Sequence, residues 1–203
     1  MSGFAYRLKR GEEWAAEVVR LIEEQGWKTV PLGAENVVPE VHRLLSFMKN
    51  PDPTARFLRY MPDGFAVKEE GEEAFFFDAK SGPTIEKDAY LAYQAFAGND
   101  RRVFVFIRNG DDTYCVPIRK LKFLDSWDCV RNFPPDRQMP VDEDGWIAPR
   151  LWPEAKYLAW KRRNPHASGT PFRYFDLGAM SKYKMGAEHR EAAPKGWPHR
   201  ARG

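Results

Sequence analysis

The stretch MPDGFAVKEEGEEAFFFDAK (residues 61–80) holds two acids, Asp63 and Asp78, on either side of a run of charged residues. The apolar run AFFF leads directly into Asp78, which predicts a buried strand that ends at this acid. If Asp63 begins the neighbouring strand of a hairpin, the two carboxylates converge, and strand alternation puts Lys80 on the same side as Asp78. Carboxylate oxygens suit Mg²⁺ or Mn²⁺. The stretch therefore predicts a divalent-cation site with an ammonium group beside it.

Composition limits the kind of protein this sequence can form. The chain has 203 residues, 43% of them hydrophobic and 14% aromatic, enough for one sizeable core and a small appendage. No apolar stretch approaches the roughly 20 residues that span a bilayer, and the first residues lack the apolar middle of a secretory signal. We therefore expect a cytoplasmic protein with no membrane partner. Two cysteines, Cys115 and Cys129, are too few for a four-cysteine zinc site and do not suggest a disulfide framework.

Charge is unevenly distributed along the chain. The net charge is +3, but the residues from Arg150 onward contain twelve Lys or Arg and four Asp or Glu, a balance of +8. Residues 1–149 therefore carry 3 − 8 = −5. A basic, aromatic tail behind a set of acids is typical of a protein that handles a polyanion, because Lys and Arg make most phosphate contacts. A solvated tail without a partner explains the same pattern equally well.

Periodicity predicts a helix near residues 11–25, which Gly26 ends, followed by a short strand WKTVPL. An insertion over residues 33–56 contains a second expected helix. Strands are expected over 57–67 and 73–80, then a helix over 84–97, then the strands RRVFVFIR and DDTYCVPI joined by a turn. We expect a core over residues 1–124. Residues 125–203 would form a proline-rich, basic and aromatic extension packed on it, with one helix in WPEAKYLAWKRR.

Pro62-Asp63, the strand FFFDAK and this order of elements resemble the PD-(D/E)XK nuclease superfamily. That superfamily includes Holliday-junction resolvases, Mrr-type restriction enzymes and many phage nucleases, and the resemblance covers about residues 11–118. It implies an α/β, restriction-endonuclease-like fold with a mixed central sheet flanked by helices. It also implies a Mg²⁺- or Mn²⁺-dependent nuclease that hydrolyses DNA phosphodiester bonds and leaves 5′-phosphate and 3′-hydroxyl ends.

The resemblance also implies roles for individual residues. Asp63 and Asp78 would be metal ligands, with the main-chain carbonyl of Ala79 as a third. Lys80 would orient and polarise the attacking water. The alternative for Lys80 is a surface lysine that ends a strand and pairs with Asp78.

Family members often carry a further ligand or supporting glutamate on the first helix. Helical phase favours Glu12, because the positions three, four and seven residues later are Ala15, Ala16 and Val19. Glu13 is followed by charged residues, and Glu17 is the third candidate. An acid at this position can equally complement the helix dipole.

Family members also often place a glutamine or tyrosine on the helix that follows the lysine, in contact with the phosphate or the water. Gln94 fits that role, with Tyr90 one turn before it. The order Tyr-x-x-x-Gln is the reverse of that in the RecB-like branch. Both residues are equally explained as the polar edge of an amphipathic helix.

Basic residues of the second half of the chain, together with Lys87, are candidates for phosphate contact. Interleaved aromatic and basic side chains can follow a backbone while stacking on bases. Trp152, Tyr157 and Trp160 are alternatively packing anchors. The candidate nucleic-acid contacts are Lys87, Lys161, Arg162, Arg163, Arg173, Lys182 and Lys184.

Two other functions are compatible with the sequence. One is a catalytically inactive nucleic-acid-binding subunit that keeps the nuclease fold, and the other is an RNA-cleaving relative, because the proposed contacts address phosphates. A homodimer is a further option, since such nucleases often cut two strands. The sequence does not distinguish duplex, junction, flap or single-strand substrates.

Overall fold

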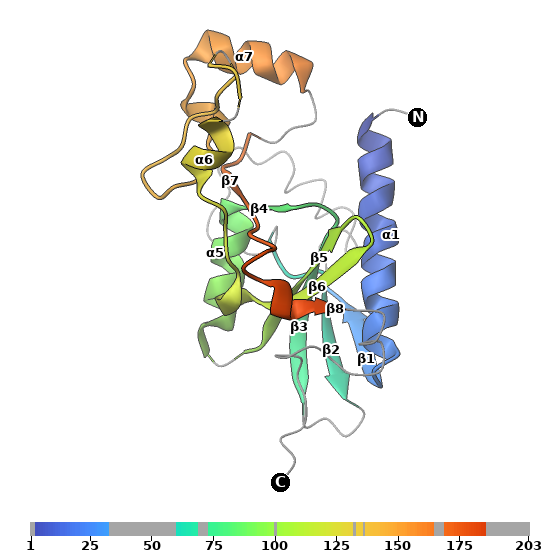
Figure 1. Ribbon diagram of the computed structural model, residues 1–203. Coiled ribbons are helices and arrows are strands. Elements are labelled where there is room, and N and C mark those ends of the chain that lie inside the picture. Colours follow the sequence, from blue (N-terminus) through green and yellow to red (C-terminus); the bar gives the residue numbers. More distant parts are fainter. Residues whose placement is uncertain are drawn as a thin grey trace.

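The computed structural model describes residues 3–32, 60–68, 73–99, 101–131, 133–135, 137–164 and 169–185. Within them a six-stranded mixed sheet has helix α1 (Gly3–Glu23) on one face and helix α5 (Lys87–Phe96) on the other (Figure 1). The expected α/β fold with a mixed sheet flanked by helices is confirmed. The insertion expected over residues 33–56, with its helix, lies outside the described residues.

The sheet has the strand order β1-β2-β3-β5-β6-β8. Its strands are β1 (Trp27–Pro31), β2 (Gly64–Lys68), β3 (Ala74–Lys80), β5 (Val103–Asn109), β6 (Asp112–Pro117) and β8 (Lys184–Met185). Among these described strands the β3–β5 pair is parallel and the other neighbouring pairs are antiparallel. A parallel pair needs a crossover connection, and α5 supplies it.

Strand β3 lies inside the sheet and is apolar on both faces. Phe75 and Phe77 pack in the cluster under α1, whereas Phe76 packs in the cluster under α5. Side chains alternate along a strand, so Asp78 and Lys80 share the face of Phe76. This alternation places the acid and the lysine on the α5 side of the sheet.

Helix α1 packs through Trp14, Val18 and Ile22, all buried. The Trp14 indole donates a hydrogen bond to the Phe106 carbonyl of β5 at 3.3 Å. The helix begins at Gly3 and not near residue 11, and a turn with Gly26 at φ +78 follows it. A positive φ suits glycine, so the predicted end is confirmed.

Residues 84–86, expected to open a helix, instead form strand β4 (Thr84–Glu86). They pair antiparallel with β7 (Phe172–Tyr174), and α5 starts directly afterwards at Lys87. The pairing joins segments far apart in the sequence, so local periodicity does not reveal it. Four short 3₁₀ helices complete the connections: η1 (Ala97–Asn99), η2 (Ile118–Lys120), η3 (Pro149–Leu151) and η4 (Ser181–Tyr183).

The chain after Leu124 contributes helices α6 (Ser126–Arg131) and α7 (Glu154–Arg163) as well as β7 and β8. Trp146, Phe175, Met180 and Tyr183 are buried in the same cluster as α5 and β5. Strand β8 pairs with β6 at one end of the main sheet. This segment therefore shares the core of the preceding residues. In the described part of the chain, no helix is both long enough and apolar enough to cross a membrane.

Candidate active site

The two acids of residues 61–80 meet where β2 begins and β3 ends. Gly64 lies opposite Phe77 in the antiparallel β2–β3 pair, so Asp63 precedes β2 at the level of Asp78. Asp63 Oδ2 accepts a hydrogen bond from the Ala79 amide at 2.8 Å. The amide and carbonyl of one strand residue point toward the same neighbouring strand. The Ala79 carbonyl is therefore directed to the side of Asp63.

Gly64 makes this close approach possible. The ring of Phe77 lies against its backbone, where a Cβ atom would clash with the ring carbons. A larger residue at this position would push β2 away from β3 or displace Phe77. The glycine that follows Asp63 thus helps to set the separation of the two acids.

Asp78 is a buried carboxylate, 1% exposed. Its Oδ1 accepts a hydrogen bond from the Tyr93 hydroxyl at 2.5 Å. Its Oδ2 lies 2.9 Å from Lys80 Nζ, an ion pair by distance, but that buried oxygen receives no well-directed hydrogen bond. Burying a carboxylate is unfavourable unless its oxygens are paired, so Tyr93 and Lys80 are what keeps Asp78 in place.

Lys80 lies between the acids and the solvent, with 27% of its side chain exposed. Its Nζ is 5.6 Å from the centre of the Tyr93 ring. Burial alone would lower the pKa of Lys80, but Asp78, Asp63 and Glu86 outweigh it, and the pKa is raised. Burial raises the pKa of Tyr93 well above its ordinary value, and the same three acids raise it further. Both groups are therefore proton donors at neutral pH.

Tyr93 and Glu86 belong to this cluster and were missed from the sequence. Tyr93 is one helical turn after the buried Ala89 on α5, so both face the sheet. Glu86 ends β4, and its approach depends on the β4–β7 pairing. The signal for Tyr93 was its place on the apolar stripe of α5, which was assigned to packing residues alone.

Gln94 is not brought to the cluster. It is one residue beyond Tyr93, about 100° further around the helix, and is exposed. Its amide nitrogen lies 2.6 Å from the Tyr90 hydroxyl and donates to it. Tyr90 packs edge-on against Phe123 and also contacts Trp146. This pair forms part of the outer surface of α5.

Glu12 is not brought to the cluster either. The buried stripe of α1 passes through Trp14 and Val18, and Glu12, two residues before Trp14, is exposed on another side. Ala16, used to infer the phase of the helix, is exposed as well. Helix α1 also covers the sheet face opposite to the one that carries Asp78.

The residues of the cluster suit a hard divalent cation with few protein ligands. Among the residues that the structure describes, no group of three or more His, Cys, Asp or Glu side chains could hold a metal. Mg²⁺, however, usually binds through one or two carboxylates, keeps several waters and completes its shell with substrate phosphates. Asp63, Asp78 and the Ala79 carbonyl are such a set, and Asp78 Oδ2 is a buried acceptor without a directed hydrogen bond.

Three of the candidate nucleic-acid contacts are engaged inside the protein. Lys87 Nζ lies 2.9 Å from Asp142 and 2.6 Å from Asp144. Lys184 Nζ lies 2.8 Å from Asp112. Arg173 donates to the carbonyls of residues 144 and 145, and its guanidinium lies over the ring of Trp146. Their contacts join distant segments.

The remaining candidates are more accessible. Arg162 and Arg163 are exposed in the last turn of α7, and Lys161 beside them is half-buried. Lys182 is exposed, with its ammonium 5.1 Å from the centre of the Tyr183 ring. The last turn of α7 is therefore the part of the predicted set that presents adjacent cations.

Comparisons with known proteins gave one kind of match. No family model and no curated protein matches the chain. A solved structure resembles it: the 1.6 Å structure of Hjc, a Holliday junction resolvase from the archaeal hyperthermophile Archaeoglobus fulgidus. The TM-score is 0.37 at 12% identity, over 57% of this chain and 78% of that chain. The likeness is weak, and the fold described here rests on the element order and strand pairing.

Proposed function

We propose that this protein is a metal-dependent nuclease that hydrolyses DNA phosphodiester bonds through Asp63, Asp78 and Lys80. The observation that carries the proposal is the buried Asp78 carboxylate, held by Tyr93 and Lys80 beside Asp63. Enclosing a charged group at the end of a strand lowers stability unless it has a function or full compensation. Clusters of this kind, with perturbed pKa values, are typical of active sites.

The chain's own groups would divide the work as follows. Asp63, Asp78 and the Ala79 carbonyl would hold Mg²⁺ or Mn²⁺. The bound cation would neutralise charge on the phosphate oxygens and lower the pKa of a coordinated water. Lys80 would hold the attacking water in line with the phosphorus. Tyr93 would fix the carboxylate plane of Asp78 through Oδ1, which leaves Oδ2 directed toward the cation.

A nucleic-acid substrate is supported by the position of the basic residues. Figure 1 shows α7 beyond the end of the sheet at which β2 begins and β3 ends, the end that carries Asp63 and Asp78. The adjacent cations of its last turn are suited to phosphates. Glu12 and Gln94 have no part in this mechanism because they lie away from Asp78. RNA stays an alternative substrate, since every contact proposed so far is to phosphate.

The proposal is tested by incubating the purified chain with labelled single-stranded, duplex, flapped and branched DNA and with RNA counterparts, in Mg²⁺ or Mn²⁺. We expect cleavage of at least one substrate and none in EDTA. Asp78→Asn should lower the rate by a factor of at least about 10²–10³, the loss typical of removing one group that stabilises charge in the transition state. Asp112→Asn, which removes an acid paired with Lys184, is the matched control and should cleave normally. Undiminished cleavage by Asp78→Asn would refute the assignment.

A second candidate, an inactive nucleic-acid-binding subunit, is favoured by one feature. The cluster is already internally paired, with Lys80 and Tyr93 on Asp78 and the Ala79 amide on Asp63. A protein released from catalysis could retain such a network as a structural unit. Binding of the same substrates without cleavage in any divalent metal would identify this function.

A further inference from the structure

Large apolar side chains are exposed on the segment that contains α6 and α7. Among the described residues, seven large hydrophobic side chains are exposed, and five of them lie between residues 124 and 158. These five are Leu124, Trp127, Phe133, Leu151 and Leu158. Trp127 is 62% exposed, a high value for the largest apolar side chain. Concentrated apolar exposure of this kind marks an interaction site.

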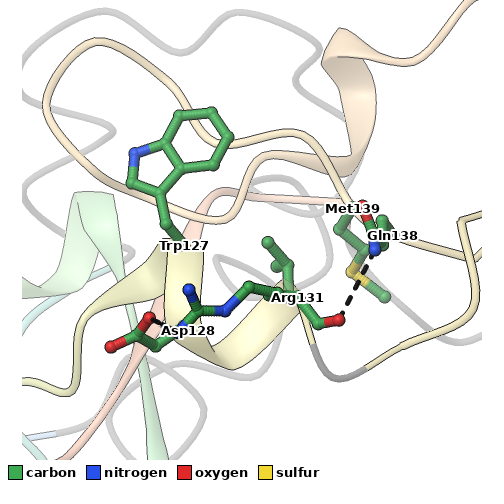
Figure 2. Close-up of a pocket in the computed structure, with 6 residues that line it drawn as sticks. Trp127, Asp128, Arg131, Gln138 and Met139 are labelled. Atoms are coloured by element: carbon green, nitrogen blue, oxygen red, sulfur yellow. Dashed lines mark hydrogen bonds and ion pairs between the residues drawn. The ribbon is translucent and has the colours of Figure 1, made fainter.

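Trp127 borders a pocket of about 240 Å³. The pocket is lined by Trp127, Asp128, Val130, Arg131, Gln138 and Met139. Figure 2 shows the indole of Trp127 projecting from α6, with Gln138 and Met139 across from the helix. The Gln138 amide is fixed by donating to the Phe133 carbonyl at 3.0 Å. We call this the α6 pocket; it is separate from the Asp63–Asp78 cluster.

The size and lining of the α6 pocket suit one planar ring system. It is smaller than the pockets of about 300–1,000 Å³ that take drug-sized ligands. An indole face and a thioether offer stacking surface, whereas Gln138 and Arg131 offer polar groups at the edge. An unpaired nucleobase has this combination of a flat face and a polar edge.

Charge complementarity favours a nucleic acid over a protein as the occupant. The Arg131 side chain is 76% exposed, although its guanidinium pairs with Asp128. Helix α7 carries Lys156, Lys161, Arg162 and Arg163 against a single acid, Glu154. The Trp152 indole, just before α7, donates to the Gln138 carbonyl at 3.0 Å, which ties this basic helix to the pocket wall. A base in the pocket would have its phosphates beside cations.

The α6 pocket is also held in place relative to the candidate active site. Ser126 at the start of α6 donates to the Gly145 carbonyl at 2.6 Å. Two residues of the same loop, Asp142 and Asp144, pair with Lys87, which directly follows Glu86 of the acid cluster. One loop therefore joins the start of α6 to the start of α5.

We infer that the α6 pocket binds an unpaired nucleobase stacked on Trp127, with Arg131 and the last turn of α7 at neighbouring phosphates. Together with the proposed nuclease activity, on which this last step rests, the substrate is a nucleic acid with a single-stranded segment next to the cleaved bond. Duplex DNA alone does not supply the base, because its bases are stacked and paired.

The test measures binding by fluorescence anisotropy in EDTA, so that no cleavage occurs. The probes are labelled single-stranded DNA, single-stranded RNA, blunt duplex DNA, and duplex DNA with a single-stranded tail. Trp127→Ala should weaken binding of the single-stranded and tailed probes by about tenfold, the loss that corresponds to one stacked base. Binding of the blunt duplex should change less than twofold, and Trp127→Phe should restore most of the affinity.

Two further variants sharpen the result. Leu91→Ala, which removes an equally accessible apolar side chain from α5, should bind every probe as the wild type does. Arg162→Gln with Arg163→Gln should reduce the salt dependence of single-strand binding by about 0.7 per lost phosphate contact. Unchanged melting temperatures for all variants would show that the fold is intact.

The inference is overturned if Trp127→Ala binds single strands as tightly as the wild type does, the result expected of a surface that serves a protein partner. It is equally overturned if the loss is the same for blunt duplex. Binding that depends on Trp127 without cleavage would support the pocket and refute the nuclease. Cleavage with Trp127-independent binding would do the reverse.

Discussion

Tyr93 is the residue on which the geometry of the acid cluster most depends. Its hydroxyl is the hydrogen-bond donor to Asp78 Oδ1, and its ring lies beneath the Lys80 ammonium. The side chain is only 2% exposed, so water does not replace the hydroxyl if it is removed. Tyr93 therefore acts on Asp78 and Lys80 together.

Replacing Tyr93 by Phe removes the donor and leaves a buried carboxylate oxygen unsatisfied. We expect the free energy of unfolding to fall by about 1–3 kcal/mol. The matched control is Tyr90→Phe, whose hydroxyl accepts from the exposed Gln94 and whose loss should stay within about 0.5 kcal/mol. Urea unfolding followed by circular dichroism measures both. Equal stabilities for the two variants would mean that Tyr93 does not hold Asp78.

Lys80→Met tests whether the ammonium takes part in the reaction. The variant keeps the length of the side chain and its contact with the Tyr93 ring but has no charge. We expect the cleavage rate to fall by about 10²–10⁴, while the affinity for the substrate measured in EDTA changes little. Lys182→Met, on an exposed lysine far along the chain, should leave the rate unchanged. A normal rate in Lys80→Met would remove Lys80 from the mechanism.

The sequence predicted the placement of Asp63, Asp78 and Lys80 because local rules decide it. Strand alternation and a hairpin between neighbouring strands are enough to bring these three side chains together. Tyr93 and Glu86 could not be assigned, since their approach depends on how α5 and β4 lie against the sheet. The phase of α1 was inferred from Ala16, which is exposed, and Glu12 was chosen on that basis.

At the scale of elements, the contact between α5 and the loop of residues 142–146 is electrostatic. Burial alone would raise the pKa of Asp142, but hydrogen bonds from Lys87 and from the amides of Trp146 and Asp144 outweigh it and lower the pKa. Hydrogen bonds to Asp142 and Asp144 raise the pKa of Lys87. The contact therefore stabilises the fold while the aspartates are ionised.

Lys87→Met should lower the free energy of unfolding at pH 7 by about 1 kcal/mol or less, as expected for a partly exposed ion pair. A lowered folded pKa gives stability that is fully present above the unfolded value of about 3.9. That stability disappears as the pH falls through the lower folded pKa. The difference between variant and wild type should thus be constant from pH 7 to about 5 and vanish near pH 2–3. A difference that persists there would mean that the contact is not ionic.

The elements with strong local signals were predicted correctly, and those made by distant pairing were not. The strand AFFFDAK and the β5–β6 hairpin follow from apolar runs and a turn with Gly110 at φ +62. Strand β4 was expected to be helical because its three residues satisfy the helical pattern of α5. Its partner β7 is nearly ninety residues later, and no local rule connects the two.

At the scale of the whole molecule, the second half of the chain completes the core of the first. Trp146, Phe175 and Met180 are buried in the cluster that also contains α5 and β5. The residues after Leu124 thus remove from water a surface that α5 and the sheet would otherwise expose. Their removal should affect folding as well as any nucleic-acid contact.

A chain that ends at Leu124 should therefore fail to unfold cooperatively. Each large side chain lost from the cluster removes about 2–5 kcal/mol, comparable in sum with the whole stability of a domain. Circular dichroism during thermal unfolding, compared with the full chain, measures this. A sharp transition near that of the full chain would instead show that residues 1–124 form an independent domain.

The central claim is that Asp63 and Asp78 share a divalent cation. Its most direct test is Mn²⁺ binding measured by electron paramagnetic resonance with uncleavable phosphorothioate DNA present, for wild type, Asp63→Asn, Asp78→Asn and the control Asp112→Asn. The account predicts a Mn²⁺ site in the wild type and in the control that is weakened at least tenfold in each of the other two variants. Equal Mn²⁺ binding in all four proteins would contradict it.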